Sequence, residues 1–469
     1  MAFTDTLFLY LFLPVCIACY YLAKTRWRNA VLIGFSLLFY AWGEPVYLWL
    51  LLLSTCLNYV FGRMISYSGE KLAAKLSLIL AMLLNVGLLF SFRCAGALTE
   101  LINTISGAAL PVPETIIPLG LSFYSLRGIS YAVDCYRGKV LAESHFSSFL
   151  LYMTLFPIVS QGPVIRYEDV QMQLRTRYTG TADLSEGLER IAIGLGKKVL
   201  LADRLAGMAD KLLLPDLLET QSALGAWCGA ALFALRFYFD LSGYSDIALG
   251  LGRIFGFRFA ENFRHPFLCR SMTEFWERWH VSLNTFFRDY VLRSSVCGNG
   301  RILPAILLAA VIGGIWHGAA WSFVLWGLFC GLIVLLEKAV GEERLEKIPA
   351  AVRHIYSKLM IILSFGIFWA ARENVLPAFL RNLFFIGEGG AADASVGTLL
   401  LQNLPLLAAA ILCCFPLYRL ARMRMQSCTS TRTYILMQTI CILFAAVLLI
   451  FSGISLAAEP AQPFVYTNF

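Results

Sequence analysis

Charged side chains are scarce in this chain. Of its 469 residues, only 14% are Asp, Glu, Lys or Arg, whereas 59% are hydrophobic. That balance lies far outside the range of soluble globular proteins. Low-complexity stretches and an internal repeat are also missing, and the missing repeat argues against a transporter built from two inverted halves.

The first apolar segment is not expected to be a cleavable signal peptide. Asp5, and no basic residue, precedes the first apolar segment, while Lys24, Arg26 and Arg28 follow it. Because basic residues tend to stay in the cytoplasm, this order predicts a retained span with its N-terminus outside.

Metal-binding patterns are weak. Cys16 and Cys19 form a C-x-x-C pair, but no second pair of ligands accompanies them. Most of the 13 cysteines lie in apolar segments, so we expect buried, reduced thiols and no metal site.

Apolar runs long enough to cross a bilayer are abundant, since a spanning helix needs about 20 residues. They predict an all-α, polytopic membrane protein with about 10 to 12 transmembrane helices, some short enough to be broken or re-entrant. The expected spans lie near residues 5–23, 30–43, 45–62, 76–92, 116–134, 146–161, 223–240, 303–316, 320–337, 359–371, 400–418 and 434–456.

Basic residues set the orientation of these spans. Those in 63–75 fall on the cytoplasmic side, as do the basic loops 338–358 and 419–432, which leaves the tail from Leu456 outside. This positive-inside asymmetry explains the net charge of +8 and calls for no nucleic acid partner.

Between about residues 162 and 300 the chain becomes more polar. Within Asp183–Leu213, ionisable and apolar residues alternate at helical spacing, which predicts a helix at the membrane interface or on the cytoplasmic face. The ionisable residues include Glu186, Glu189, Arg190, Lys197, Lys198, Asp203, Arg204 and Asp210.

A first polar cluster, F-D-L-S-G-Y-S-D, occupies residues 239–246 at the expected end of an apolar helix. Asp240, Tyr244 and Asp246 are its candidate functional residues, and Gly243 permits close backbone approach. The alternative is a helix-end cap, because Asp and Ser are preferred capping residues. A cap does not exclude a functional role.

A second cluster occupies residues 275–290. On a single helix, every fourth residue from Trp276 to Arg288, through His280 and Asn284, shares one face. Such a stripe can recognise a polar group or a phosphate-bearing donor such as a coenzyme. The alternative is the solvated face of a cytoplasmic helix, against which the two tryptophans argue. The candidate substrate-contacting residues here are Trp276, Arg278, Asn284, Arg288 and Asp289.

A lone histidine, His317, lies in the segment I-G-G-I-W-H-G-A-A-W, within apolar sequence from Leu303 to Leu336. An ionisable side chain at membrane depth is costly, so a functional role is the default interpretation. Imidazole also transfers protons near neutral pH. Beside Trp316, His317 is a candidate general base in a confined tunnel. The alternative is an imidazole that donates one hydrogen bond between helices.

Residues 275–290 and Trp316-His317-Gly318 together resemble the signature of the membrane-bound O-acyltransferase family, in particular its bacterial branch of alginate and peptidoglycan O-acetyltransferases. Residues 118–124, P-L-G-L-S-F-Y, and 239–246 resemble that branch too. One departure is Val291–Arg301, which replaces the family's proline-glycine turn and in which Gly298–Gly300 is expected to turn the chain.

The resemblance implies a transmembrane fold around a central tunnel over residues 1–456, with its catalytic core at about 116–337. It implies that His317 is the catalytic histidine and His280 the second family histidine, on the cytoplasmic side of the tunnel. It also implies a bacterial cytoplasmic-membrane enzyme with no resident cofactor. Its donor would be an acyl thioester such as acetyl-coenzyme A, and its partner an extracytoplasmic SGNH-type O-acetyltransferase.

The chain ends in P-F-V-Y-T-N-F, which contains F-x-Y-x-x-F. This resembles the tail motif of cross-membrane acylation systems, and implies that Tyr466, in an extracytoplasmic tail at 457–469, accepts the acyl group covalently. The alternative is a set of aromatic residues that anchor the tail at the membrane interface.

Two functions stay open beside O-acetylation of an extracellular polysaccharide such as an alginate-like polymer or peptidoglycan. One is a D-alanyl transferase for teichoic acid, which is similar to this family but usually has its tail motif on a separate small protein. The other is a polysaccharide or lipid transporter, for which two related halves and a nucleotide-binding loop are missing.

Overall fold

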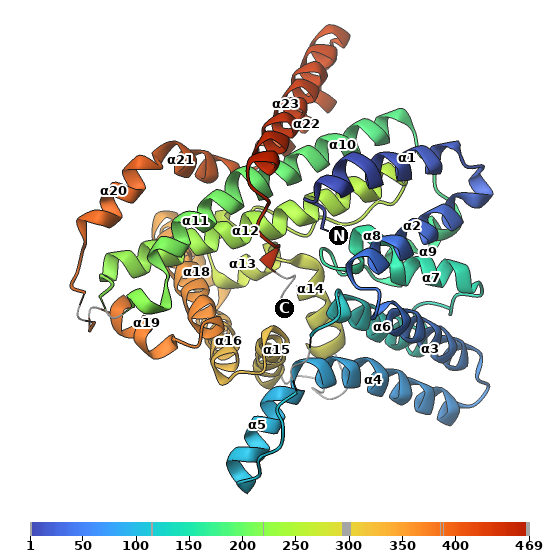
Figure 1. Ribbon diagram of the computed structural model, residues 1–469, viewed down its shortest axis with the longest axis horizontal. Coiled ribbons are helices and arrows are strands. Elements are labelled where there is room, and N and C mark those ends of the chain that lie inside the picture. Colours follow the sequence, from blue (N-terminus) through green and yellow to red (C-terminus); the bar gives the residue numbers. More distant parts are fainter. Residues whose placement is uncertain are drawn as a thin grey trace. The chain divides into compact units, whose positions relative to one another are not determined.

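The computed structural model shows a helical protein (Figure 1). It describes residues 2–113, 116–218, 220–292, 302–384, 386–387 and 389–465. Every regular element within these ranges is a helix, which confirms the all-α expectation. Tyr466 and the turn expected at Gly298–Gly300 lie outside the described residues.

The chain divides into two compact units. The first contains Met1–Ile191, Tyr244–Glu261 and Pro463–Phe469, and the second contains Ala192–Gly243 and Asn262–Gln462. The helices that belong wholly to the first are α1 (Leu13–Leu22), α2 (Arg28–Gly43), α3 (Leu48–Tyr67), α4 (Lys71–Arg93), α5 (Ala95–Ser106), α6 (Leu121–Tyr136), α7 (Phe146–Thr154), α8 (Phe156–Val159) and α9 (Tyr167–Arg175).

Two helices cross the boundary between the units: α10 (Thr181–Leu195) and α12 (Ala223–Ile254). The remaining helices belong to the second unit. They are α11 (Asp203–Leu212), α13 (Met272–Arg278), α14 (Val281–Phe286), α15 (Ile302–His317), α16 (Trp321–Val340), α17 (Glu342–Glu346), α18 (Ala350–Arg372), α19 (Leu376–Leu383), α20 (Ala394–Gln402), α21 (Leu404–Cys413), α22 (Leu417–Gln426) and α23 (Thr431–Ala458).

Six helices of the described chain are long and apolar enough to cross a membrane, namely α3, α4, α12, α16, α18 and α23. The pair α20 and α21 is bent by 68° and makes a seventh if it forms one broken span. Other expected spans are shorter or interrupted. Helix α6 begins only at Leu121, and the span expected at 146–161 is split into α7 and α8.

The polar middle of the chain is largely helical. The helix expected at Asp183–Leu213 is present as α10, a π-helical segment at Gly196–Ala202 and α11, in direct succession. The helix expected to end near Asp240 instead continues to Ile254 as α12. The helix-end cap proposed for residues 239–246 is therefore wrong, because those residues lie inside a helix.

In the first unit, Gly120 sets the start of α6 within the motif at 118–124. Its φ of 71° is left-handed, and a Cβ built there would lie 2.1 Å from the carbonyl oxygen of Val159, so only glycine fits. Tyr40 donates a hydrogen bond to the carbonyl of Leu119 (3.0 Å), and Glu44 accepts one from its amide (2.7 Å). This motif therefore has a structural explanation.

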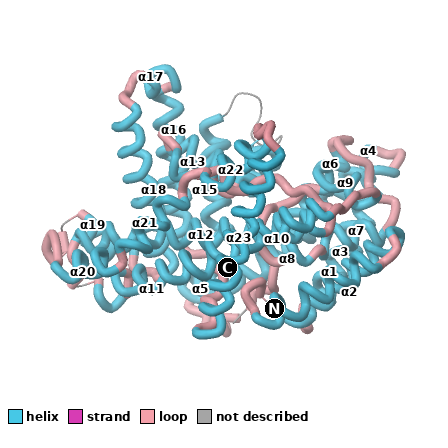
Figure 2. The backbone as a smooth tube through the Cα atoms, turned by 90° about the horizontal axis from the view of Figure 1, so that it is seen from above, coloured by secondary structure: helices cyan, strands magenta, loops and turns pink. Residues whose placement is uncertain are grey.

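In the second unit, α15 and α16 form a hairpin, and α16 and α18 run side by side with the short α17 where they join (Figure 2). This group of helices carries His317.

Candidate active site

His317 is the last residue of α15 and is half-buried among aromatic rings. Its imidazole lies 5.0 Å from the ring of Trp326 and 5.0 Å from that of Phe368, at interplanar angles of 88° and 89°. The ring of Trp316 is 4.7 Å away. Such edge-to-face contacts orient the imidazole and narrow the space around it.

Glycines let α15 approach α16 closely enough to form this cluster. A Cβ at Gly314 would lie 2.4 Å from the carbonyl oxygen of Phe323, and one at Gly327 would lie 2.2 Å from that of Ala310. Small residues allow helix backbones to pack this closely in membranes. The same packing places Trp326 beside His317.

Trp276 lies near His317, because both contact the ring of Trp326. The ring centroid of Trp276 lies 6.2 Å from that of Trp326. The indole of Trp326 is fixed by a hydrogen bond to Ser364 Oγ at 3.1 Å. Trp276 and Trp316 are thus the sequence-predicted residues that the structure gathers around His317.

The expected stripe from Trp276 to Arg288 does not exist as one helical face. Helix α13 ends at Arg278, and His280 adopts a left-handed conformation (φ 43°, ψ 54°) before α14 begins at Val281. The i+4 arithmetic was therefore wrong, because it assumed an unbroken helix. Arg288 follows in a π-helical segment at Phe287–Leu292.

Asn262 holds the turn at His280. Its carbonyl accepts from the amide of Val281 (2.9 Å), and its side-chain oxygen accepts from the amide of Ser282 (3.1 Å). His280 is 4% exposed, and this burial lowers the pKa of its imidazole to about 4. His280 is therefore neutral at physiological pH and can donate only one N–H hydrogen bond.

The other predicted members of this cluster have local partners. The side-chain amide of Asn284 donates to the carbonyls of Trp276 and of Trp279 (3.1 Å to Trp279), which completes the C-terminal end of α13. Its two N–H groups are thereby occupied.

Arg278 and Arg288 form ion pairs with acidic neighbours. Arg278 lies 2.5 Å from Glu274, and Arg288 lies 3.1 Å from Asp289. All of these distances are within the second unit, and they connect these arginines to α13 and to the π-helical segment rather than to His317.

Glu337 of α16 fixes the N-terminus of α13. Its buried carboxylate accepts hydrogen bonds from the amides of Met272 (2.7 Å) and Thr273 (2.8 Å), and from the phenol of Tyr356 (3.1 Å). A carboxylate at a helix N-terminus also complements the helix dipole. Glu337 was not singled out from the sequence.

Asp240 is buried in an ion pair. Lys198, 1% exposed, lies 2.6 Å from Asp240 and 2.9 Å from Asp203. Such a cation compensates two carboxylates that would otherwise be costly to bury. The sequence showed Lys198 among many charges but gave no indication of its partners.

Asp246 and Tyr244 lie in the first unit. Asp246 pairs with Arg190 at 2.6 Å, and Arg190 also pairs with Glu261 at 2.6 Å. Tyr244 shares a hydrogen bond of 2.8 Å with Ser160, and its ring lies 5.1 Å from that of Phe464, edge to face. The structure therefore joins a predicted site residue to the first aromatic residue of the tail motif.

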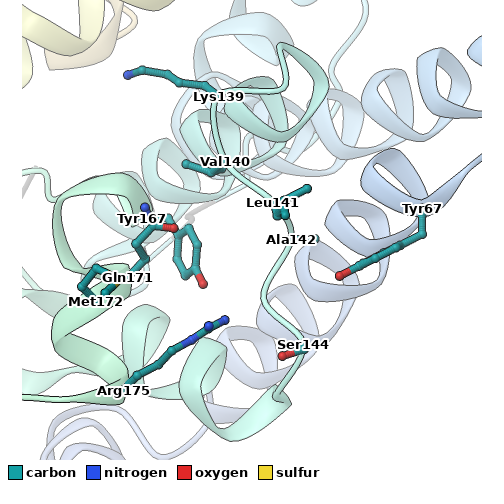
Figure 3. Close-up of a pocket in the computed structure, with 10 residues that line it drawn as sticks. All are labelled: Tyr67, Lys139, Val140, Leu141, Ala142, Ser144, Tyr167, Gln171, Met172 and Arg175. Carbon is teal, nitrogen blue, oxygen red and sulfur yellow. The ribbon is translucent and has the colours of Figure 1, made fainter.

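A separate pocket of about 360 Å³ lies in the first unit, between the end of α3, the loop at 139–144 and α9 (Figure 3). Arg175 points into it, and Tyr167 lies beside it (Figure 3). Both side chains contact the buried carboxylate of Glu143, at 3.4 Å and 2.7 Å. The residues that line the pocket include none of those predicted for the site.

Comparison with known proteins decides the family. The description "MBOAT, membrane-bound O-acyltransferase family" matches residues 37–345. The chain belongs to the membrane-bound O-acyltransferase family. It is thus a multi-pass membrane O-acyltransferase, as the motifs implied. The transporter alternative is set aside, because the family is one of acyl-transferring enzymes.

Relatives of this O-acyltransferase act in polymer modification. The probable alginate O-acetylase AlgI of Pseudomonas aeruginosa is 34% identical over 422 residues, which cover 87% of this chain and 81% of the relative. The peptidoglycan O-acetyltransferase of Helicobacter pylori is 30% identical over 376 residues, covering 72% and 71%. The teichoic acid D-alanyltransferase of Streptococcus thermophilus is 29% identical over 241 residues, covering 47% and 57%.

Proposed function

We propose that this O-acyltransferase passes an acetyl group from a cytoplasmic thioester, such as acetyl-coenzyme A, across the cytoplasmic membrane for O-acetylation of an extracellular polysaccharide. The polymer is of the alginate or peptidoglycan type, by likeness to the relatives. The observation that carries the proposal is the imidazole of His317, which contacts three aromatic rings edge to face at the end of α15.

In the proposed step, His317 takes the proton of an acceptor hydroxyl while the hydroxyl oxygen attacks the thioester carbonyl. The new C–O bond forms, the C–S bond breaks, and the imidazolium returns the proton to the departing thiolate. General base catalysis of this kind contributes about 10²–10⁴-fold.

The acceptor in this proposal is the phenol of Tyr466. A phenol has a pKa near 10, so it needs a base at neutral pH. Phe464, two residues earlier, is 3% exposed and packs against Tyr244. That buried contact supports a tail that is part of the folded protein. A separate extracytoplasmic SGNH-type transferase then moves the acyl group to the glycan.

Asn284 and His280 are the two candidates for stabilising the oxyanion. Both amide hydrogens of Asn284 donate to backbone carbonyls at the end of α13, so the role is assigned to the N–H group of His280.

Acyl transfer by purified variants tests the catalytic assignment. We expect His317→Ala to lose transfer by at least about 10²-fold while remaining folded and membrane-inserted. His145→Ala, at an exposed histidine, is the matched control and should behave as the parent. Parental transfer by His317→Ala would contradict the general-base role.

Tyr466→Phe tests the acceptor with a labelled acetyl donor. The variant should still bind donor but should accumulate no label on the protein, and polymer acetylation should stop. Label on the variant would exclude the tyrosine relay without affecting the role of His317. The D-alanyl alternative is suggested by the similarity to the Streptococcus D-alanyltransferase. It is tested by supplying a D-alanyl carrier protein in place of acetyl-coenzyme A, and transfer only from the carrier protein would support it.

A further inference from the structure

The chain just before the tail motif is held by polar contacts within the second unit. Arg236 of α12 donates a hydrogen bond to the side-chain oxygen of Gln462 at 3.1 Å. The backbone of Gln462 also lies beside the carboxylate of Asp203. Gln462 is thus fixed through its side chain and has Asp203 next to its backbone.

The two residues beside Gln462 are themselves fixed by charge. Asp203 lies 2.9 Å from the buried Lys198, which also pairs with Asp240. Arg236, whose side chain is 18% exposed, lies 3.0 Å from Asp210. A partly buried arginine held by a carboxylate loses little conformational freedom when it binds a further acceptor.

Burying Lys198 between two carboxylates is a costly way to stabilise a helix, because apolar residues of similar volume usually do as well or better. We therefore interpret the cluster of Lys198, Asp203 and Asp240 as a device that fixes the orientation of the Asp203 carboxylate toward the chain at Gln462.

Gln462 lies four residues before Tyr466, and four residues of chain extend no further than about 14 Å. A fixed point at Gln462 therefore limits where the phenol can reach. Helix α23 ends at Ala458, and Gln462 lies halfway along the chain from there to Tyr466.

We propose that Arg236 and Asp203, supported by Lys198 and Asp240, are positioning residues that anchor Gln462 and so present Tyr466 for acyl transfer. This inference rests on the proposed function of Tyr466. It gives Asp240 a role in tail positioning in place of contact with the substrate.

The test uses the full-length protein and two variants that remove one side of the contact each, Arg236→Met and Gln462→Leu. Variants of Lys198 are avoided, because they leave two carboxylates unpaired and would unfold the protein before the tail is tested. Arg204→Met is the matched control. Arg204 also contacts this segment, at Ser455 (3.2 Å) and Glu459 (3.5 Å), but its ion pair with Glu459 is exposed and should contribute little.

We expect each variant to slow labelling of Tyr466 by about tenfold, the effect of losing one charge-assisted hydrogen bond that orders the acceptor. The double variant should be no slower than either single one, because both remove the same contact. Arg204→Met should stay within about twofold of the parent.

A soluble phenol separates positioning from a merely structural role. In a Tyr466→Phe background, acyl transfer to N-acetyltyrosinamide should be unaffected by Arg236→Met. Equal losses in the soluble reaction and in tail labelling would overturn the inference, as would parental labelling in both single variants or an equal loss in Arg204→Met.

Hydrogen exchange keeps this inference separate from the acceptor assignment. The amides of Ala461, Gln462, Phe464 and Val465 should exchange about tenfold faster in Arg236→Met and Gln462→Leu than in the parent. If the parent takes no label at Tyr466, the acceptor assignment is wrong. The proposed anchoring of Gln462 is then tested by the exchange rates alone. Unchanged exchange in both variants would overturn it.

Discussion

At the scale of single residues, two substitutions of His280 can separate the contribution of its left-handed backbone conformation from that of its imidazole. Its φ of 43° lies in a region that asparagine adopts far more readily than alanine. We expect His280→Asn to unfold near the parental temperature in detergent, and His280→Ala to lose about 1 kcal/mol more. Acyl transfer should fall in both variants. A fully active His280→Asn protein would remove the imidazole from the mechanism.

The buried imidazole of His280 also predicts how stability depends on pH. Its pKa is lowered to about 4 by burial, against about 6.5 in an unfolded chain. The unfolded state therefore binds a proton first as the pH falls. The stabilisation is complete above about pH 6.5 and is lost between about pH 6.5 and 4. The unfolding temperature should decline over this range more steeply in the parent than in His280→Asn, and equal slopes would contradict a neutral, buried imidazole.

At the scale of helices, adjacent glycines in α15 predict opposite outcomes. A Cβ at Gly314 would collide with the backbone of Phe323, whereas one at Gly313 meets nothing within 4 Å. Gly314→Ala should lower both the unfolding temperature and acyl transfer, with a cost of about 1–3 kcal/mol for forcing α15 off α16. Gly313→Ala is the control at equal helix propensity and should leave both unchanged. Matching losses in the two variants would mean that this packing does not place His317.

Helices could be predicted from the apolar runs, but their ends depend on partners distant in sequence. Helix α12 continues through Asp240 because Lys198, 42 residues earlier, neutralises the carboxylate. The expected stripe breaks at His280 because Asn262 holds the next turn. The hydrophobic periodicity of a short sequence window reveals neither contact. It therefore predicted that the helix would end near Asp240, where α12 continues, and that the helix at residues 276–288 would be unbroken, although it breaks at His280.

At the scale of the molecule, His317 could be singled out as a candidate from its isolation in apolar sequence, but its surroundings could not be predicted. Trp326 and Phe368 come from α16 and α18, and they meet the imidazole only through the packing of the second unit. The tail motif F-x-Y-x-x-F could likewise be recognised in the sequence. The contact of Phe464 with Tyr244 depends on folding within the first unit.

The direction of acyl transfer depends on the orientation of the whole chain in the membrane. Gly69, in the loop between α3 and α4, and Ser106, at the end of α5, lie on either side of α4 in sequence. Helix α4 has 23 residues, which span about 35 Å and suffice to cross a bilayer. Both positions are exposed, so a cysteine at either is open to a thiol reagent.

The basic residues near Gly69 predict that its loop is cytoplasmic and that Ser106 lies outside. A membrane-impermeant maleimide should therefore label Ser106→Cys in intact spheroplasts, and label Gly69→Cys only in inverted vesicles, with the parent's own thiols as the baseline. The reverse pattern would place the donor face outside the cell, where a cytoplasmic thioester cannot reach it. Transfer from the cytoplasm to an outside polymer through Tyr466 would then be ruled out, even if His317 remained the base.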